Sequence, residues 1–223
     1  IEIIQRRNHT TTMIEPFTVS GRFFNGYKPS DIEETPLLFQ TGYLTIKHKE
    51  VNEGIPSYIL GVPNSEVNEA FLTCLLKSYG KYPDEQIDNL RLTMERQLRN
   101  CDEAGFNNSL EAMIATVPYE LHHNNEAYYH TIMLIWLRLL GFKIQGETPN
   151  NRGRSDIVWE QPGLTVVAEL KYHAETKIEA LLKNAIDQIH DLRYYNKYIG
   201  KVLLLGVAFS GKDVGCKMEV INR

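Results

Sequence analysis

The segment Leu164–Tyr172 constrains the fold of this chain more than any other, because it is an apolar run that carries two charged residues. Side chains of a strand alternate between the faces of a sheet, so Val167, Glu169 and Lys171 would share one face. An apolar run of this kind predicts a central strand that is covered on both sides. Glu169 and Lys171 would then be partly desolvated, and such groups require partners.

Around this strand the sequence predicts an α/β sandwich on a mixed sheet that begins at Pro118. The elements come in the order helix, three strands, helix, strand, with bounds of Glu126–Leu140, Phe142–Thr148, Asp156–Trp159, Leu164–Tyr172, Thr176–Tyr198 and Lys201–Phe209. The first helix is expected to be amphipathic and to end at Gly141. Its predicted buried face consists of Tyr129, Ile132, Met133, Trp136 and Leu140.

Residues 1–76 predict a small winged-helix-like α+β region. After a partly helical lead-in over residues 1–35, a helix that ends at Gly42 precedes two strands, Tyr43–Lys47 and Tyr58–Val62, which a long polar loop joins into a hairpin. A helix capped at Asn64-Ser65-Glu66 follows, with an apolar face of Val67, Phe71, Leu72, Leu75 and Leu76. Such a unit either contacts DNA or serves only for packing, and both interpretations stay open.

Residues 77–117 are polar and predict a helical connector of two helices. Pro83, Gly105 and the pair Asn107-Asn108 are the expected breaks. No internal repeat or low-complexity tract occurs along the chain.

The composition is that of a globular protein, with 43% hydrophobic and 23% charged residues. No apolar run approaches the roughly 18–20 residues that span a bilayer, and no signal peptide is recognisable, so no membrane partner is expected. The start at Ile1 rather than Met suggests a fragment of a longer protein. Three widely spaced cysteines indicate neither a disulfide framework nor a zinc site, which favours the cytoplasm.

The net charge of −4 is unevenly distributed along the chain. Residues 1–117 hold 11 Lys and Arg against 16 Asp and Glu, whereas residues 118–223 hold 13 against 12. The two parts therefore carry −5 and +1. A near-neutral domain that gathers its acids at a metal site can still carry a basic rim, so net charge neither supports nor excludes nucleic-acid binding.

A two-residue turn at Pro162-Gly163 would set Gln161 opposite Leu164 and Asp156 opposite Glu169, with Cβ atoms about 4.5–5.5 Å apart. A longer loop would shift this register by one or two residues. Two facing carboxylates destabilise a sheet unless one is protonated or a cation lies between them. The pair therefore suits a divalent ion such as Mg²⁺, which prefers oxygen ligands.

The carbonyl oxygen of Leu170 is a third candidate metal ligand. Lys171 could stabilise negative charge on a transferring phosphate or lower the pKa of an attacking water. The alternative is a surface ion pair among Asp156, Glu169 and Lys171. The order of these residues along the chain, with Asp156 before the hairpin turn and Glu169 and Lys171 after it, within the predicted α/β elements, favours the catalytic interpretation.

The residues Gly153-Arg154-Ser155-Asp156, followed by Glu169-Leu170-Lys171, resemble the PD-(D/E)XK nuclease superfamily over about residues 118–223. Ser155 stands where the superfamily pattern has Pro. The resemblance implies a restriction-endonuclease-like α-β-β-β-α-β sandwich and a nuclease that depends on Mg²⁺ or Mn²⁺.

Leu37–Lys47 and Tyr58–Asn64 also resemble a bacterial family in which an AAA-ATPase-like region precedes such a nuclease domain. By that resemblance, residues 1–76 would be the tail of the ATPase-like region. The chain holds no G-x-x-x-x-G-K-[ST] loop, so no ATP site is expected in it.

The superfamily resemblance adds two acidic candidates. Glu126, near the start of a helix, would position metal or water, or else be a helix-dipole partner after the potential caps Asn124 and Asn125. Glu147 would support a metal ligand from behind by a hydrogen bond or bind a second metal, or else be a surface residue.

Candidate nucleic-acid contacts complete the set. Arg152 and Arg154 flank Asp156 and could contact phosphate, or else be exposed loop arginines. Gln188 and Tyr195 lie seven residues apart and would share a helix face, although related nucleases use a shorter spacing. His130 and His190 show no partner pattern and are read as ordinary helix residues.

Three functions remain in competition. The first is a divalent-metal-dependent nuclease acting on DNA rather than RNA. The second is a non-catalytic module that keeps the nuclease fold and binds nucleic acid or protein. The third is a fragment of an ATP-driven regulator whose wing does the binding. Nucleic acid is the expected partner, and a homo-oligomer is left open.

Overall fold

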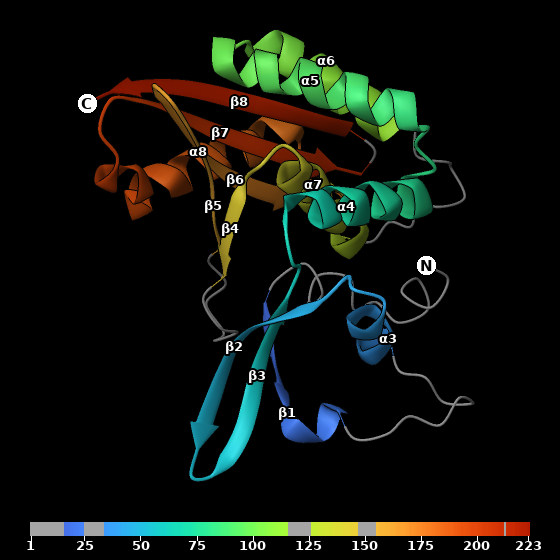
Figure 1. Ribbon diagram of the computed structural model, residues 1–223. Coiled ribbons are helices and arrows are strands. Elements are labelled where there is room, and N and C mark those ends of the chain that lie inside the picture. The colour runs from blue at the N-terminus through green and yellow to red at the C-terminus, as the bar shows by residue number, and fades with distance from the viewer. Residues whose placement is uncertain (1–15, 25–33, 116–125, 147–154, 212) are drawn as a thin grey trace. The chain divides into compact units, whose positions relative to one another are not determined.

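The computed structural model describes residues 16–24, 34–115, 126–146, 155–211 and 213–223 (Figure 1). The chain forms two compact units, Ile1–Ser78 and Tyr79–Arg223. Among the described helices, none combines the length and the apolar character that a membrane crossing requires.

The first unit contains a three-stranded antiparallel sheet in the order β1-β3-β2. Its elements are β1 (Phe17–Ser20), the short 3₁₀ helix η1 (Gly21–Phe24), α3 (Glu34–Gln40), β2 (Thr45–Asn52) and β3 (Ile55–Gly61), followed by α4 (Ser65–Gly80). A hairpin after a short helix is therefore confirmed. The strand β1 was missed, since residues 17–20 were expected to belong to a partly helical lead-in.

The expected long loop between the hairpin strands is wrong. Asn52 pairs with Ile55, so only Glu53 and Gly54 form the turn. Both have positive φ, 51° and 80°, which matches the type I′ turn that the twist of a two-residue hairpin favours. The predicted end of α3 and the predicted start of α4 are confirmed. Gly42, just after α3, is left-handed (φ 82°), and the Asn64 side chain accepts the Val67 N–H at 2.9 Å at the start of α4.

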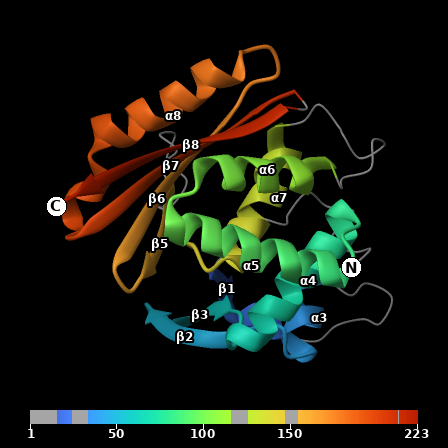
Figure 2. The ribbon, with the colours of Figure 1, turned by 90° about the horizontal axis from the view of Figure 1, so that it is seen from above.

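The second unit is an α/β sandwich around a five-stranded mixed sheet in the order β4-β5-β6-β7-β8. Only β6 and β7 are parallel; the other described neighbours are antiparallel. The elements are α5 (Asp84–Asn100), α6 (Glu103–Ala115), α7 (Glu126–Leu139), β4 (Lys143–Gly146), β5 (Ser155–Gln161), β6 (Leu164–Tyr172), α8 (Ile178–Leu192), η3 (Tyr194–Lys197), β7 (Lys201–Ser210) and β8 (Asp213–Asn222). Figure 2 shows α8 on one side of the sheet and α5, α6 and α7 on the other.

Two helices in the expected connector are confirmed, but they break at a different place. Cys101 is left-handed (φ 52°), and the Asp102 carboxylate accepts the Gly105 N–H at 2.9 Å at the start of α6. Gly105 therefore lies inside a first helical turn rather than at a break. Both helices belong to the same compact unit as the five-stranded sheet. The expected boundary at Pro118 lies outside the described residues.

The helix α7 is buried more completely than an amphipathic pattern implies. Besides the expected Ile132, Met133, Trp136 and Leu140, the core includes Leu134, Ile135 and Leu137. The side chain of Tyr129 lies outside the described part of the structure. The apolar stripe thus widens into a helix with apolar neighbours nearly all round, typical of an interior helix.

The strand β8 was not expected, and the long helix predicted over Thr176–Tyr198 is shorter. The helix α8 ends at Leu192 because Arg193 is left-handed (φ 50°), and the separate turn η3 follows. The sequence of β8 does alternate apolar and polar residues from Val214 to Val220, a pattern that is typical of a half-buried strand.

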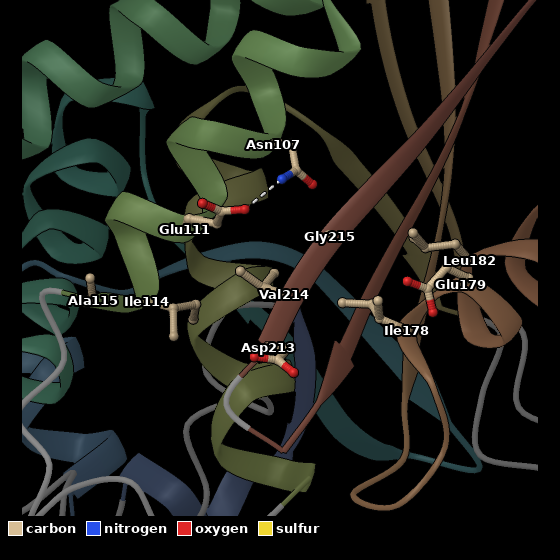
Figure 3. A pocket seen from close by; sticks show the side chains of 10 residues that line it. All are labelled: Asn107, Glu111, Ile114, Ala115, Ile178, Glu179, Leu182, Asp213, Val214 and Gly215. Carbon is tan, nitrogen blue, oxygen red and sulfur yellow. Dashed lines mark hydrogen bonds between the residues drawn. The ribbon is translucent and has the colours of Figure 1, made fainter.

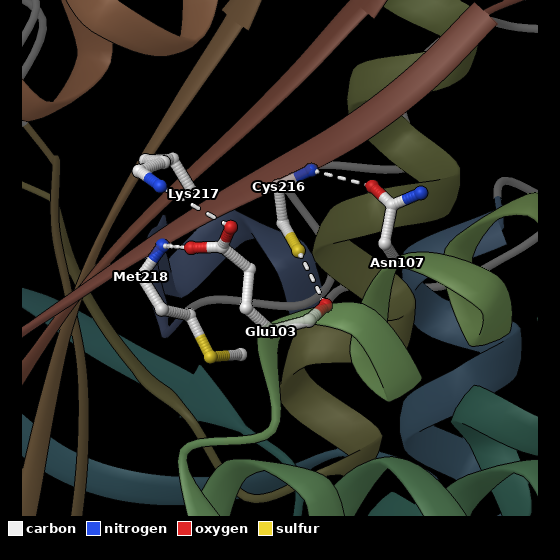
Figure 4. Close-up of polar contacts among 5 residues, drawn as sticks. All are labelled: Glu103, Asn107, Cys216, Lys217 and Met218. Atoms are coloured by element: carbon white, nitrogen blue, oxygen red, sulfur yellow. Dashed lines mark hydrogen bonds and ion pairs between the residues drawn. The ribbon is translucent and has the colours of Figure 1, made fainter.

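The helix α6 covers part of the outer edge of β8 (Figure 4). The Asn107 side chain accepts the Cys216 N–H at 3.0 Å, and the Glu103 carboxylate accepts the Met218 N–H at 2.7 Å. Lys217 adds an ion pair to Glu103 at 3.2 Å. Unpaired N–H groups of an edge strand invite pairing with other chains, so these side chains protect that part of the edge.

Glu103→Ala should lower the free energy of unfolding by about 1–2 kcal/mol, because it leaves the Met218 N–H without its charged acceptor. The matched control, Lys217→Ala, removes only the exposed ion pair and should cost at most about 0.5 kcal/mol. Urea titrations followed by circular dichroism measure both. Equal losses in the two variants would contradict this account of the edge.

Burial, reinforced by the charge of Glu103, raises the pKa of the Cys216 thiol from 9.0 to about 12. Above about pH 9 the unfolded thiol ionises while the folded thiol stays protonated, so its contribution lowers folding stability as pH rises. At about pH 8 a thiol reagent should label the half-buried Cys74 and Cys101 before unfolding, and Cys216 only after it.

The control for this labelling is Cys216→Ala. It should leave the native label count unchanged and remove one label from the denatured protein. Rapid modification of Cys216 in the native wild type would show that the thiol is accessible and the predicted protection wrong.

Candidate functional site

The β5–β6 hairpin has the register that the short turn predicted. Gln161 pairs with Leu164, and the ladder continues to Ile157 opposite Ala168. Gly163 has φ 82°, which suits the second central position of a type II turn after Pro162. The longer-loop alternative is therefore excluded, and Asp156 and Glu169 are the next residues on their two strands.

Three side chains form a polar cluster on the face of β6 that α8 covers. Lys171 Nζ lies 3.0 Å from Glu169 Oε1 and also donates to Gln188 Oε1. Gln188 Nε2 donates in turn to Glu169 Oε1 at 2.8 Å. The amide of Gln188 thus uses its oxygen for the ammonium and its nitrogen for the carboxylate, an assignment that only one amide orientation permits.

The burial of this cluster makes its hydrogen bonds important. The side chains of Lys171 and Glu169 are only 23% and 15% exposed. Charges in such a place lose hydration and need compensation from each other and from a polar neighbour. The parallel strand β7 supplies no polar side chain opposite these two residues, because Glu169 pairs with Gly206 and Lys171 pairs with Ala208.

Buried apolar residues between α8 and the sheet fix the position of Gln188 beside the polar cluster. Val167, Ile186, Ile189, Val202 and Leu204 form a buried core between α8 and the sheet. Ile189, which follows Gln188, is fully buried. Packing of the helix therefore determines where the Gln188 amide reaches.

The side chains of several predicted site residues lie outside the described part of the structure. The backbone of Asp156 belongs to β5 and that of Glu126 to α7, but their side chains lie outside the described part of the structure. Glu147, Arg152 and Arg154 lie outside the described residues altogether. Among the described side chains, no group of three or more His, Cys, Asp and Glu residues is arranged to hold a metal ion.

Tyr195 does not share a helix with Gln188, so that expectation is wrong. It lies in η3, its hydroxyl is 3.1 Å from His190 Nδ1, and its ring packs against the core beneath α8. His190 Nε2 lies 3.0 Å from Glu219 Oε2. His190 is therefore not an ordinary helix residue, since it bridges Tyr195 and β8.

A cavity of about 680 Å³ lies elsewhere in this unit, between α6, the start of α8 and the start of β8 (Figure 3). Glu111, Glu179 and Asp213 provide acidic groups at its wall, and Ile114, Ile178, Leu182 and Val214 provide apolar ones. None of its lining residues is a predicted site residue. The cavity is therefore separate from the cluster around Glu169.

Residues 124–219 match the family model described as the PD-(D/E)XK nuclease superfamily. The match supports a nuclease-type domain in this part of the chain, in agreement with its mixed α/β architecture. Nucleases of this superfamily act on nucleic acid and generally use divalent metal ions.

The chain is also similar to an uncharacterized protein in the vnfD 5′ region of Azotobacter chroococcum mcd 1. The two are 27% identical over 218 residues, which cover 94% of this chain and 41% of that protein. The chain thus spans less than half the length of this relative. No solved structure matches this chain.

Gln188→Ala should lower the free energy of unfolding by about 1–3 kcal/mol, because Lys171 and Glu169 lose a shared partner in a half-buried place. Asn184→Ala is the matched control on the exposed side of the same helix and should stay within about 0.5 kcal/mol of wild type. Urea unfolding compares the two. Indistinguishable variants would mean that the Gln188 contacts contribute nothing to stability.

Proposed function

We propose that this chain carries a divalent-metal-dependent nuclease centre built on Asp156, Glu169 and Lys171, with DNA as its substrate rather than RNA. The observation that carries the proposal is the half-buried cluster of Glu169, Lys171 and Gln188, which lies inside the matched nuclease-type domain. Gln188 contacts both charged residues from α8, which suits a centre in which a lysine ammonium has to be held in a fixed position.

The chemistry of the candidate donors fits a hard divalent ion. Glu169 offers a carboxylate with 15% of its side chain exposed, and Asp156 directly precedes the paired residue Ile157 on the neighbouring strand. Asp156, Glu169, the Leu170 carbonyl and Glu147 would hold Mg²⁺ or Mn²⁺ through oxygen atoms. When bound, such an ion makes water a better nucleophile at neutral pH and offsets negative charge on phosphate.

Lys171 is the residue proposed to act on the reacting phosphate. Its ammonium would stabilise the negative charge that develops there, and Gln188 would hold that ammonium in place as a positioning residue. Glu169 Oε1 lies 3.0 Å from Lys171 Nζ, so the two opposite charges compensate each other where both side chains are largely buried. Glu126 is proposed to orient water at the start of α7.

Arg152 and Arg154 are the proposed phosphate contacts, with the exposed Lys177 and Lys183 extending the basic rim. The charge of +1 over residues 118–223, against −5 over residues 1–117, favours the second part as the nucleic-acid-binding part. Tyr195 is left out of the proposed contacts because its hydroxyl is bonded to His190.

We also propose that the first unit is winged-helix-like and belongs to a longer, ATPase-linked protein. Its three-stranded sheet and the tight β2–β3 hairpin after α3 support the first part of this proposal. The similarity to a relative of more than twice the matched length supports a longer protein, and the ATPase link rests on the resemblance of Leu37–Lys47 and Tyr58–Asn64. A chain with the fold but no cleavage activity would favour the alternative, a non-catalytic binding module.

Lys171→Ala should abolish cleavage and spare metal binding, because an ammonium is not a metal ligand. The full chain is incubated with plasmid and single-stranded DNA in Mg²⁺, Mn²⁺ or EDTA, and thermal melting with and without Mn²⁺ reports binding. Wild type should cleave with a metal and stop in EDTA. Its melting temperature should rise with Mn²⁺, and so should that of the variant.

Glu169→Gln is the control that should lose both cleavage and the Mn²⁺-induced rise in melting temperature. If Lys171→Ala also loses that rise, Lys171 is structural. If no metal supports cleavage by the wild type and Mn²⁺ leaves its melting temperature unchanged, the centre is not a metal-dependent nuclease.

A further inference from the structure

The strand β8 is the last strand of its sheet, so one of its edges has no partner among the described strands. Arg223 and Gly200 exchange both backbone hydrogen bonds, each at 3.0 Å, at the end of the β7–β8 pair. Hydrogen-bonded and non-hydrogen-bonded pairs alternate along an antiparallel ladder. The N–H groups of Val220 and Asn222 therefore point away from β7.

The cover that α6 gives to this edge stops at Met218. The side chains of α6 accept the N–H groups of Cys216 and Met218. Among the described residues, none accepts a hydrogen bond from the N–H groups of Val220 and Asn222. Figures 1 and 2 show α6 beside the earlier part of β8 and not beside its end near the C-terminus.

Apolar side chains are exposed around this open segment, residues 219–223. Val220 is 42% exposed, and Ile199, which precedes Gly200, is 93% exposed. Proteins usually block an edge strand with charges, prolines or a covering element. Here one half of β8 is covered and the other presents both unpaired backbone donors and apolar surface, which suits pairing with another strand.

We infer that the open segment of β8 pairs in antiparallel fashion with the same segment of a second copy of this chain. The available donors determine the register. Val220 would face the partner's Asn222, and Asn222 the partner's Val220, which adds about four backbone hydrogen bonds. A shift toward Met218 would require an N–H that Glu103 already occupies.

Charge complementarity supports this occupant. In the register centred on Ile221, Glu219 lies opposite the partner's Arg223, and the twofold symmetry of the pair repeats this contact. Both side chains lie on the α8 face, since Glu219 contacts His190 and Arg223 lies over the Tyr195 ring. A parallel, in-register pairing would instead set each charge beside its own copy.

The sharpest test reverses the two charges in the 223-residue chain and follows self-association by sedimentation velocity over a concentration series. Wild type should dimerise. Glu219→Arg alone and Arg223→Glu alone should each raise the dimer dissociation constant by about tenfold or more. The two single variants mixed together should dimerise with each other, and the double variant should recover dimerisation.

His190→Gln is the matched control, because it alters the contact of Glu219 within one chain and leaves the cross-strand charges unchanged. It should dimerise like wild type. If it weakens the dimer as much as Glu219→Arg does, the effect of the charge reversal comes from the interior of one subunit, and the inferred pairing is wrong.

A second pair of variants tests the backbone. Val220→Pro removes an outward N–H and leaves the β7 ladder intact, so dimerisation should be lost without a loss of secondary structure. Val220→Thr keeps the N–H and should dimerise. A wild type that stays monomeric, or a dimer that survives Val220→Pro, overturns the inference. Neither result bears on cleavage, since the inference does not rest on the nuclease proposal.

Discussion

The second unit has to accommodate two opposite charges on β6, a strand whose other residues are mostly buried and apolar. Glu169 and Lys171 follow Val166, Val167 and Ala168, all of which are at most 2% exposed. Charges that lose hydration in this way are tolerated only when they are paired and hydrogen-bonded. The helix that crosses from β6 to the parallel strand β7 meets this need, because such a crossover must pack on one face of the sheet. It brings Gln188 over the two charges.

The parts of this arrangement that could be predicted from sequence are those set by local chemistry. The bounds of β6 agree with the prediction, because its apolar run ends at charges and begins after the Pro162-Gly163 turn. That turn also set the register toward Asp156 and Glu169, since a two-residue loop allows one pairing only. Gln188 was selected by resemblance, and the structure adds its contacts with both charged residues.

The parts that could not be predicted depend on tertiary context. Arg193 ends α8 in a left-handed conformation that its sequence does not signal, since glycine or asparagine usually takes that place. His190 contacts Tyr195, which lies in a separate turn, and Glu219, which lies on a strand distant in sequence. The role of Glu103 likewise appears only when α6 lies along β8. The strand β8 differs, because its alternating pattern was available in the sequence.

One turn of α8 links the polar cluster of Glu169, Lys171 and Gln188 to β8 at the edge of the sheet. Ile189 is fully buried against the core, and its neighbours in sequence point about 100° to either side of it. Gln188 therefore reaches β6, where it contacts Glu169, and His190 reaches β8, where it contacts Glu219. Because Gln188 and His190 flank the buried Ile189 on one helical turn, a shift of this turn would move both contacts together. The proposed active centre and the open edge of β8 are thus held by the same packed helix.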